Sequence, residues 1–135
     1  MLVYTKEQEY HKVLVPLYLL MQLSRKAYAK YLQNKIYLYA LTIRMSNKKI
    51  YDFIMGHLSE VPEPIQDDVL ELLNHYDIWM EQFREFEASK KPSVADLFVF
   101  HHIDSQSAFP KQAEQHIFDY YKELKNSIHQ YNNHE

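Results

Sequence analysis

A single period of large apolar residues runs through the middle of the chain, from Ile65 to Phe86. The steps between these residues alternate between four and three, which is the spacing of one face of a long α-helix. A β-strand would instead place apolar residues at every second position. The pattern therefore predicts one long central helix with a buried seam. The seam residues are Ile65, Val69, Leu72, Tyr76, Trp79, Phe83 and Phe86.

The use of glycine and cysteine narrows the remaining fold classes. Among 135 residues the only glycine is Gly56, and there is no cysteine. Glycine supplies the positive φ angles of hairpin turns and of phosphate-binding loops, so sheet-rich folds, dinucleotide-binding turns and P-loops are disfavoured. The lack of cysteine excludes disulfides, zinc ribbons and thiol catalysis. These observations favour an all-α, single-domain antiparallel bundle of four to five helices.

Turn-forming and cap-forming residues divide the chain into helices. Pro16 either kinks the first helix or opens a new one at its first turn. Asn34 is the expected break after that helix, although an uninterrupted helix also fits the sequence. Ser46 and Asn47 compete for backbone hydrogen bonds and can interrupt the second helix. The expected helices cover about residues 6–33, 35–56, 64–88, 94–104 and 109–131, within a bundle domain of residues 1–131 and before a disordered tail at 132–135.

The expected short helix near residue 100 is apolar and contains two adjacent histidines. Ser93 and Asp96 form a cap-like pair at its start, and a turn follows at Asp104. His101 and His102 follow a run of four apolar residues, so at least one imidazole is expected to be buried and to need a hydrogen-bond partner. We favour a structural hydrogen bond over catalysis for this pair.

The charged residues are divided between two parts of the chain. Residues 1–50 contain nine Lys and Arg against two acids, a net charge of +7, because nine minus two is seven. Residues 60–87 contain nine acids against one arginine, Arg84, a net charge of −8, because one minus nine is minus eight. The chain as a whole has a net charge of only −3. The division predicts a bundle with an acidic side and a basic side.

The acidic residues of the central helix form the first candidate binding surface. With the seam buried, they are expected on or beside the outer surface, where a row of carboxylates can steer a basic partner protein. A basic nuclease active site is one such partner. The other interpretation is an ordinary solvated helix face. The candidate residues are Asp67, Asp68, Glu71, His75, Asp77, Glu81 and Glu85.

The second candidate surface combines cations with tyrosines in the basic first third of the chain. Arg25, Tyr28 and Tyr31 lie in one interleaved stretch, and Tyr and Arg are favoured anchors of protein interfaces. Nucleic-acid binding needs a concentrated positive surface, and the net negative charge argues against it. Tyrosine also fills the boundaries of bundles, and the basic helices can simply pack beside the acidic one.

A metal site is the alternative function, because histidines occur along the whole chain. Bundles that bind metal use inward-facing Glu-x-x-His pairs, and no such pair occurs here. The nearest matches are Glu71 with His75, four residues apart, and His101 with Asp104, three residues apart. The other interpretation is that these histidines are satisfied by water or by neighbouring carboxylates. We therefore expect no cofactor.

No catalytic motif is evident in the chain. There is no glycine-flanked serine elbow, and no histidine follows an arginine at the spacing of small helical ribonucleases. The first residues lack a signal peptide. The longest apolar run has nine residues and contains Pro16, far short of the roughly 20 residues of a membrane span. We expect a cytoplasmic protein that is not bound to a membrane, and we favour a binding protein over an enzyme.

The sequence thus predicts a small helical protein that acts by binding another macromolecule. Its most concrete form is an inhibitor, an immunity-type protein or an adaptor that uses the acidic helix face or the tyrosine-rich basic surface. A homodimer is also compatible, because a seam buried within one chain and a seam buried between two chains give the same pattern.

Overall fold

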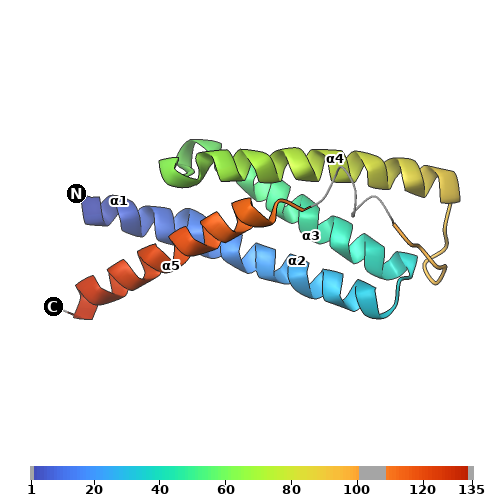
Figure 1. The fold of residues 1–135 in the computed structure, drawn as a ribbon, viewed down its shortest axis with the longest axis horizontal. Helices are drawn as coiled ribbons and strands as arrows, with labels where there is room; N and C mark the ends of the chain where they lie inside the picture. The colour runs from blue at the N-terminus through green and yellow to red at the C-terminus, as the bar shows by residue number, and fades with distance from the viewer. Residues whose placement is uncertain (1, 101–108, 134–135) are drawn as a thin grey trace.

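The computed structural model describes residues 2–100 and 109–133, which form four long helices in an elongated bundle (Figure 1). The all-α bundle expected from the sequence is therefore confirmed. Both ends of the described chain lie at the same end of the bundle. The elements are α1 (Leu2–Glu9), the π-helical turn η1 (Tyr10–Leu14), α2 (Val15–Gln33), α3 (Tyr37–Gly56), the 3₁₀ turns η2 (Leu58–Glu60) and η3 (Glu63–Ile65), α4 (Gln66–Lys90) and α5 (Lys111–Asn133).

The segments α1, η1 and α2 follow one another as a continuous helix that widens just before Pro16. The N–H of Val15 bonds the carbonyl of Tyr10, five residues earlier, instead of the residue four positions back. Proline lacks an N–H, and its ring clashes with the carbonyl four residues before it, which is that of Lys12. The π turn gives this carbonyl room. The helix then continues to the expected break at Asn34, whose backbone is extended.

Helix α3 runs through Ser46 and Asn47 without interruption, so the break considered from the sequence does not occur. Both side chains are buried, and Asn47 Oδ1 accepts a hydrogen bond from Ser24 Oγ at 3.0 Å. The Asn47 side chain therefore links α3 to α2. The helix ends at Gly56, as expected.

The helix expected over residues 94–104 is wrong for its described part, because residues 97–100 form no helix and follow a turn. The cap-like pair does form, since Asp96 Oδ2 accepts the N–H of Ser93 at 2.8 Å, but it closes a single turn. The chain then runs beside the start of α3, where the N–H of Phe98 bonds the carbonyl of Lys35 at 2.8 Å. Residues 101–104 lie outside the described part of the chain.

Burial of aromatic side chains explains the extended conformation of this segment. Phe98 and Phe100 are buried, whereas Leu97 is 76% exposed. This alternation is the two-residue period of an extended chain. The Tyr31 hydroxyl donates a hydrogen bond to the Phe98 carbonyl at 2.7 Å and accepts the Phe100 N–H at 3.2 Å. Local helix propensity is therefore outweighed by long-range aromatic packing and by pairing to α2.

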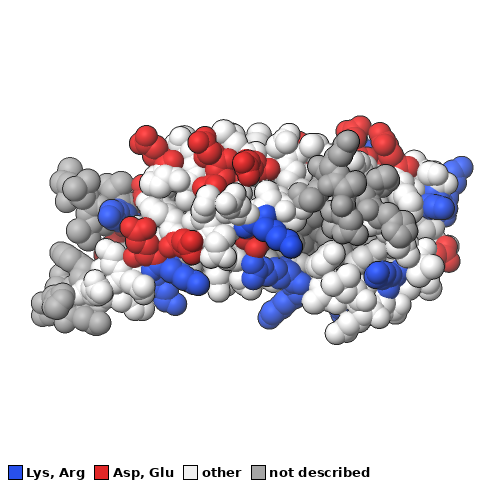
Figure 2. Space-filling view, in the orientation of Figure 1, with Lys and Arg blue, Asp and Glu red and all other residues white. Residues whose placement is uncertain are grey.

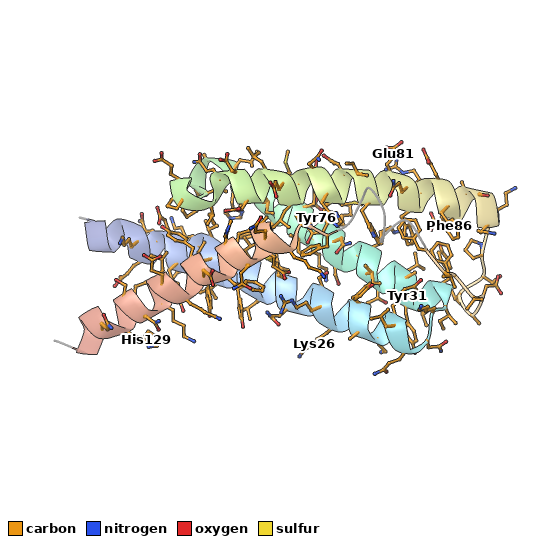
Figure 3. All side chains as sticks on the ribbon, in the orientation of Figure 1. Lys26, Tyr31, Tyr76, Glu81, Phe86 and His129 are labelled. Atoms are coloured by element: carbon orange, nitrogen blue, oxygen red, sulfur yellow. The ribbon has the colours of Figure 1, made fainter. Side chains whose placement is uncertain are left out.

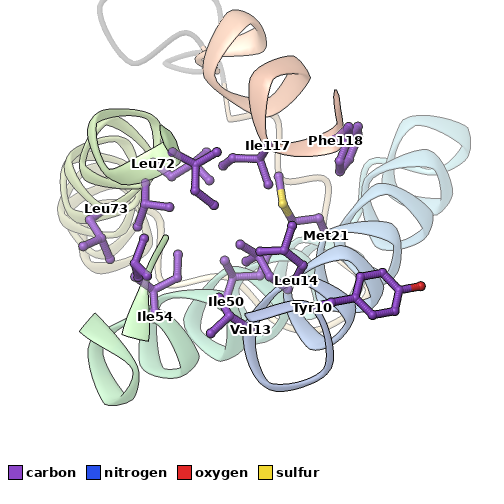
Figure 4. Close-up of a cluster of buried hydrophobic side chains, with 14 of the residues drawn as sticks. Tyr10, Val13, Leu14, Met21, Ile50, Ile54, Leu72, Leu73, Ile117 and Phe118 are labelled. Atoms are coloured by element: carbon purple, nitrogen blue, oxygen red, sulfur yellow. The ribbon is translucent and has the colours of Figure 1, made fainter. Parts of the chain in front are cut away.

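The seam of α4 forms the centre of the core. Six of the seven seam residues are buried, Ile65 at the end of η3 and five in α4, and only Phe86 is partly exposed. Figure 4 shows Leu72 and Leu73 of α4 facing Ile50 and Ile54 of α3 and Ile117 of α5. The seam is therefore buried within one chain. Across the described helices, none is both long enough and apolar enough to cross a membrane.

Candidate protein-binding surface

The outer face of α4 carries a row of exposed carboxylates. Figure 2 shows acidic side chains along the edge of the molecule where α4 lies, and Figure 3 shows Glu81 pointing away from the bundle. At 1.5 Å per residue, the row extends over about 27 Å along a helix. We call this surface the acidic face. Its residues are Asp67, Glu71, Asp77, Glu81 and Glu85, all exposed, with the half-buried Asp68 at its border.

Within the described residues, no ion pair joins a cation of the chain to the acidic face itself, although the exposed Arg84 lies on the same helix between Glu81 and Glu85. Asp77 accepts a hydrogen bond from the Tyr51 hydroxyl, which raises the pKa of Tyr51, but this bond brings no positive charge. The ion pairs are Arg25 with Glu114, Arg44 with Glu87, Lys48 with Asp52, and His116 with Asp68 at the border. In the described part of the chain, the pair of Arg44 and Glu87, at 2.9 Å, is the only ion pair that joins α2 or α3 to α4. The carboxylates of the acidic face therefore keep their charge facing solvent.

Two exposed aliphatic side chains lie among the carboxylates of α4. Leu70 is 58% exposed and Ile78 is 38% exposed. They are eight residues apart, or about 12 Å along the helix. Apolar side chains surrounded by charged ones are typical of the centre and rim of a protein interface. The sequence alone did not single out these two residues. The available signal is that both are aliphatic residues of the central helix that do not belong to its seven-residue seam.

Two residues assigned to binding surfaces from the sequence lie in the interior instead. His75 is buried on the flank of α4, where its ring packs edge-on against Phe109 at 5.3 Å between centroids. Tyr31 is buried and is held by the backbone of residues 98 and 100. Neither side chain can contact a partner protein in this conformation.

The basic, tyrosine-rich surface is also largely engaged within the bundle. The Arg25 guanidinium bonds the carboxylate of Glu114 and lies 4.8 Å from the centre of the Phe118 ring. Tyr28 is half-buried beside Tyr31. The three residues expected to form this surface therefore bind α5 and the core, which leaves the acidic face as the better candidate.

The metal-binding alternative gains no supporting geometry. In the described part of the chain, no three histidine, aspartate or glutamate side chains are grouped as metal ligands. Glu71 is exposed whereas His75 is buried, so the two do not share one surface. The other proposed ligands, His101 and Asp104, lie outside the described residues. His102 also lies outside them, so the expected burial and hydrogen bond of the histidine pair stay a prediction.

A cavity of about 800 Å³ lies between α2, α3, α4 and the start of α5. Its described wall includes Trp79 and Tyr76 of α4. It also includes the Ser24–Asn47 hydrogen bond and the ion pair between Arg25 and Glu114. These polar groups are paired with one another, and the wall also includes His75, Lys111 and Gln115.

Comparison of the chain with protein-family models, with curated proteins and with solved structures finds no match. The assignment of function therefore rests on the geometry and charge of the described surface.

Proposed function

We propose that this protein acts by binding another protein, whose basic surface docks on the acidic face of α4. The observation that supports this function is a row of exposed carboxylates that form no ion pair within the described residues, with the exposed Leu70 and Ile78 among them. The carboxylates would accelerate association with a basic partner, and the aliphatic side chains would be removed from water on contact. An inhibitor or adaptor of this kind needs no catalytic group and no cofactor.

The surface suits a transient complex better than a permanent one. Obligate interfaces are large and mostly apolar, whereas this face is charged and carries only two exposed aliphatic side chains. Interactions between exposed charges weaken as salt is added, because the screening length is about 8 Å at physiological ionic strength. We therefore expect fast association whose rate falls with salt concentration.

Site-specific photo-crosslinking in the cells that make the protein tests this function. A photo-reactive amino acid is placed at Ile78 on the acidic face or, as a control, at Met55, which is 46% exposed on α3. We expect an adduct with a second protein from position 78, absent from position 55 and lost when Glu71→Lys and Glu81→Lys are added. Equal adducts from both positions, or adducts that survive the charge reversal, would contradict the proposed function.

A further inference from the structure

A second exposed stripe, on α2, complements the acidic face in charge. Leu19, Leu23, Lys26 and Lys30 are exposed and are separated by four, three and four residues, so they share one side of the helix. The leucines are 59% and 45% exposed. We call these four residues the basic stripe. Like the acidic face, which is mainly negative, it combines two exposed aliphatic side chains with charged ones.

The charge of the basic stripe is not neutralised by the rest of the described chain. Helix α2 contains no Asp or Glu, and among residues 2–100 and 109–133 no ion pair involves Lys26 or Lys30. The Lys30 ammonium lies 5.1 Å from the centre of the Tyr39 ring, a contact that leaves its positive charge in place. The stripe is therefore a cationic and partly apolar surface facing solvent.

The two surfaces point away from opposite edges of the bundle. Figure 3 shows Lys26 directed outward from α2 on one edge and Glu81 directed outward from α4 on the other. The basic stripe of one molecule therefore cannot reach its own acidic face. It can reach the acidic face of a neighbouring molecule, where lysines would meet carboxylates and leucines would meet Leu70 and Ile78.

We propose that the basic partner of the acidic face is a second copy of this chain, which presents its basic stripe; this inference rests on the proposed function of α4. The contact joins two different surfaces, so it is heterologous and not two-fold symmetric. Because the surfaces lie on opposite edges, a bound pair of molecules leaves one acidic face and one basic stripe open. Association is therefore open-ended, and the average size grows with protein concentration.

The first test is the mass of the purified protein in solution, measured by sedimentation equilibrium over a range of concentrations and salt. The screening length is about 30 Å at 0.01 M salt and about 3 Å at 1 M. We expect the average mass to exceed that of one chain and to rise with concentration at low salt, and to return to that of one chain at high salt. A single-chain mass at low salt and the highest soluble concentration would overturn the inference.

Charge-reversed variants test the two surfaces separately. Lys26→Glu with Lys30→Glu reverses the basic stripe, and Glu81→Lys with Glu85→Lys reverses part of the acidic face. Each exposed charge pair is worth up to about 1 kcal/mol, so each double variant should weaken self-association about tenfold or more. The matched controls are Lys122→Glu with Lys125→Glu and Glu60→Lys with Glu123→Lys, which make the same charge changes on exposed residues elsewhere and should have little effect.

Mixing the two reversed variants gives the decisive result. The Lys26→Glu, Lys30→Glu variant keeps its acidic face. The Glu81→Lys, Glu85→Lys variant keeps its basic stripe, so one intact contact can form between the two. We expect each variant alone to associate more weakly than the unchanged protein, and their mixture to recover association, because the intact pair of surfaces and the doubly reversed pair are both complementary in charge. A mixture that associates no more strongly than either variant alone, or a variant that associates as strongly as the unchanged protein, would overturn the head-to-tail arrangement.

Failure of this inference is distinguishable from failure of the proposed function. One outcome is a protein that stays a single chain at low salt and still forms the position-78 adduct with a different protein in cells. This result would keep the acidic face as a binding surface but would exclude a second copy of the chain as its partner. A protein that self-associates equally well after charge reversal of α4 contradicts this inference alone, whereas the lack of a position-78 adduct with any protein contradicts the proposed function.

Discussion

Replacing Phe98 with alanine tests the non-helical segment after α4, which is the part of the fold that departs most from the sequence expectation. The Phe98 side chain is 1% exposed, and its ring centroid lies 4.9 to 5.2 Å from those of Phe86, Tyr37 and Phe83. Truncation of a buried phenylalanine removes its apolar surface and leaves a cavity, which costs about 3–5 kcal/mol. We expect the free energy of unfolding, measured by urea denaturation, to fall by that amount.

The neighbouring residue provides the matched control. Leu97 is 76% exposed, and surface substitutions of this kind change stability by no more than about 0.5 kcal/mol, so Leu97→Ala should leave the denaturation midpoint nearly unchanged. If Phe98→Ala does not fold, Phe98→Leu keeps most of the volume and should cost less than about 1.5 kcal/mol. Equal losses from the Leu97 and Phe98 alanine variants would refute the alternating inward and outward arrangement of this segment.

Three further predictions concern the buried aromatic residues. Tyr31→Phe leaves the buried carbonyl of Phe98 without its 2.7 Å hydrogen bond and should lower the free energy of unfolding by about 1–3 kcal/mol, measured by urea denaturation. Trp79→Ala should cost about 3–5 kcal/mol, and an unchanged melting temperature would contradict burial of the seam. Burial raises the pKa of Tyr76 and Tyr120 above their ordinary value of 10.0. The unfolded chain therefore releases these protons first, so their stabilising contribution is complete below pH 10.0 and is lost as pH rises above it, which unfolding midpoints measured against pH would show.

The long helices could be predicted because their signals are local. The period of the seam defined α4, and Gly56 and Asn34 marked the ends of α3 and α2. The segment around Phe98 could not be predicted in this way. Its cap-like start is a true local hydrogen bond, but its conformation depends on aromatic partners on α4 and on the distant Tyr31 hydroxyl, which no local pattern reveals.

The candidate site was predictable in part for a similar reason. Residues opposite the seam face solvent whatever packs on the seam, and this places Glu71 and Glu81 outside. Residues on the flank of the seam depend on the course of another helix. His75 is buried because the start of α5 brings Phe109 against it, and the sequence of α4 contains no signal of that contact.

The most direct test of the acidic face is amide chemical-shift mapping with a defined basic probe. The probe is a helical peptide that presents lysine and leucine side chains on one face. Isotope-labelled protein is held at low concentration, to limit self-association, and is titrated with the unlabelled peptide. We expect shifts concentrated between Asp67 and Glu85 of α4 that disappear in Glu71→Lys with Glu81→Lys. Shifts of equal size on α5, around the exposed Asp119 and Glu123, would show attraction to any acidic surface and would contradict a dedicated binding face on α4.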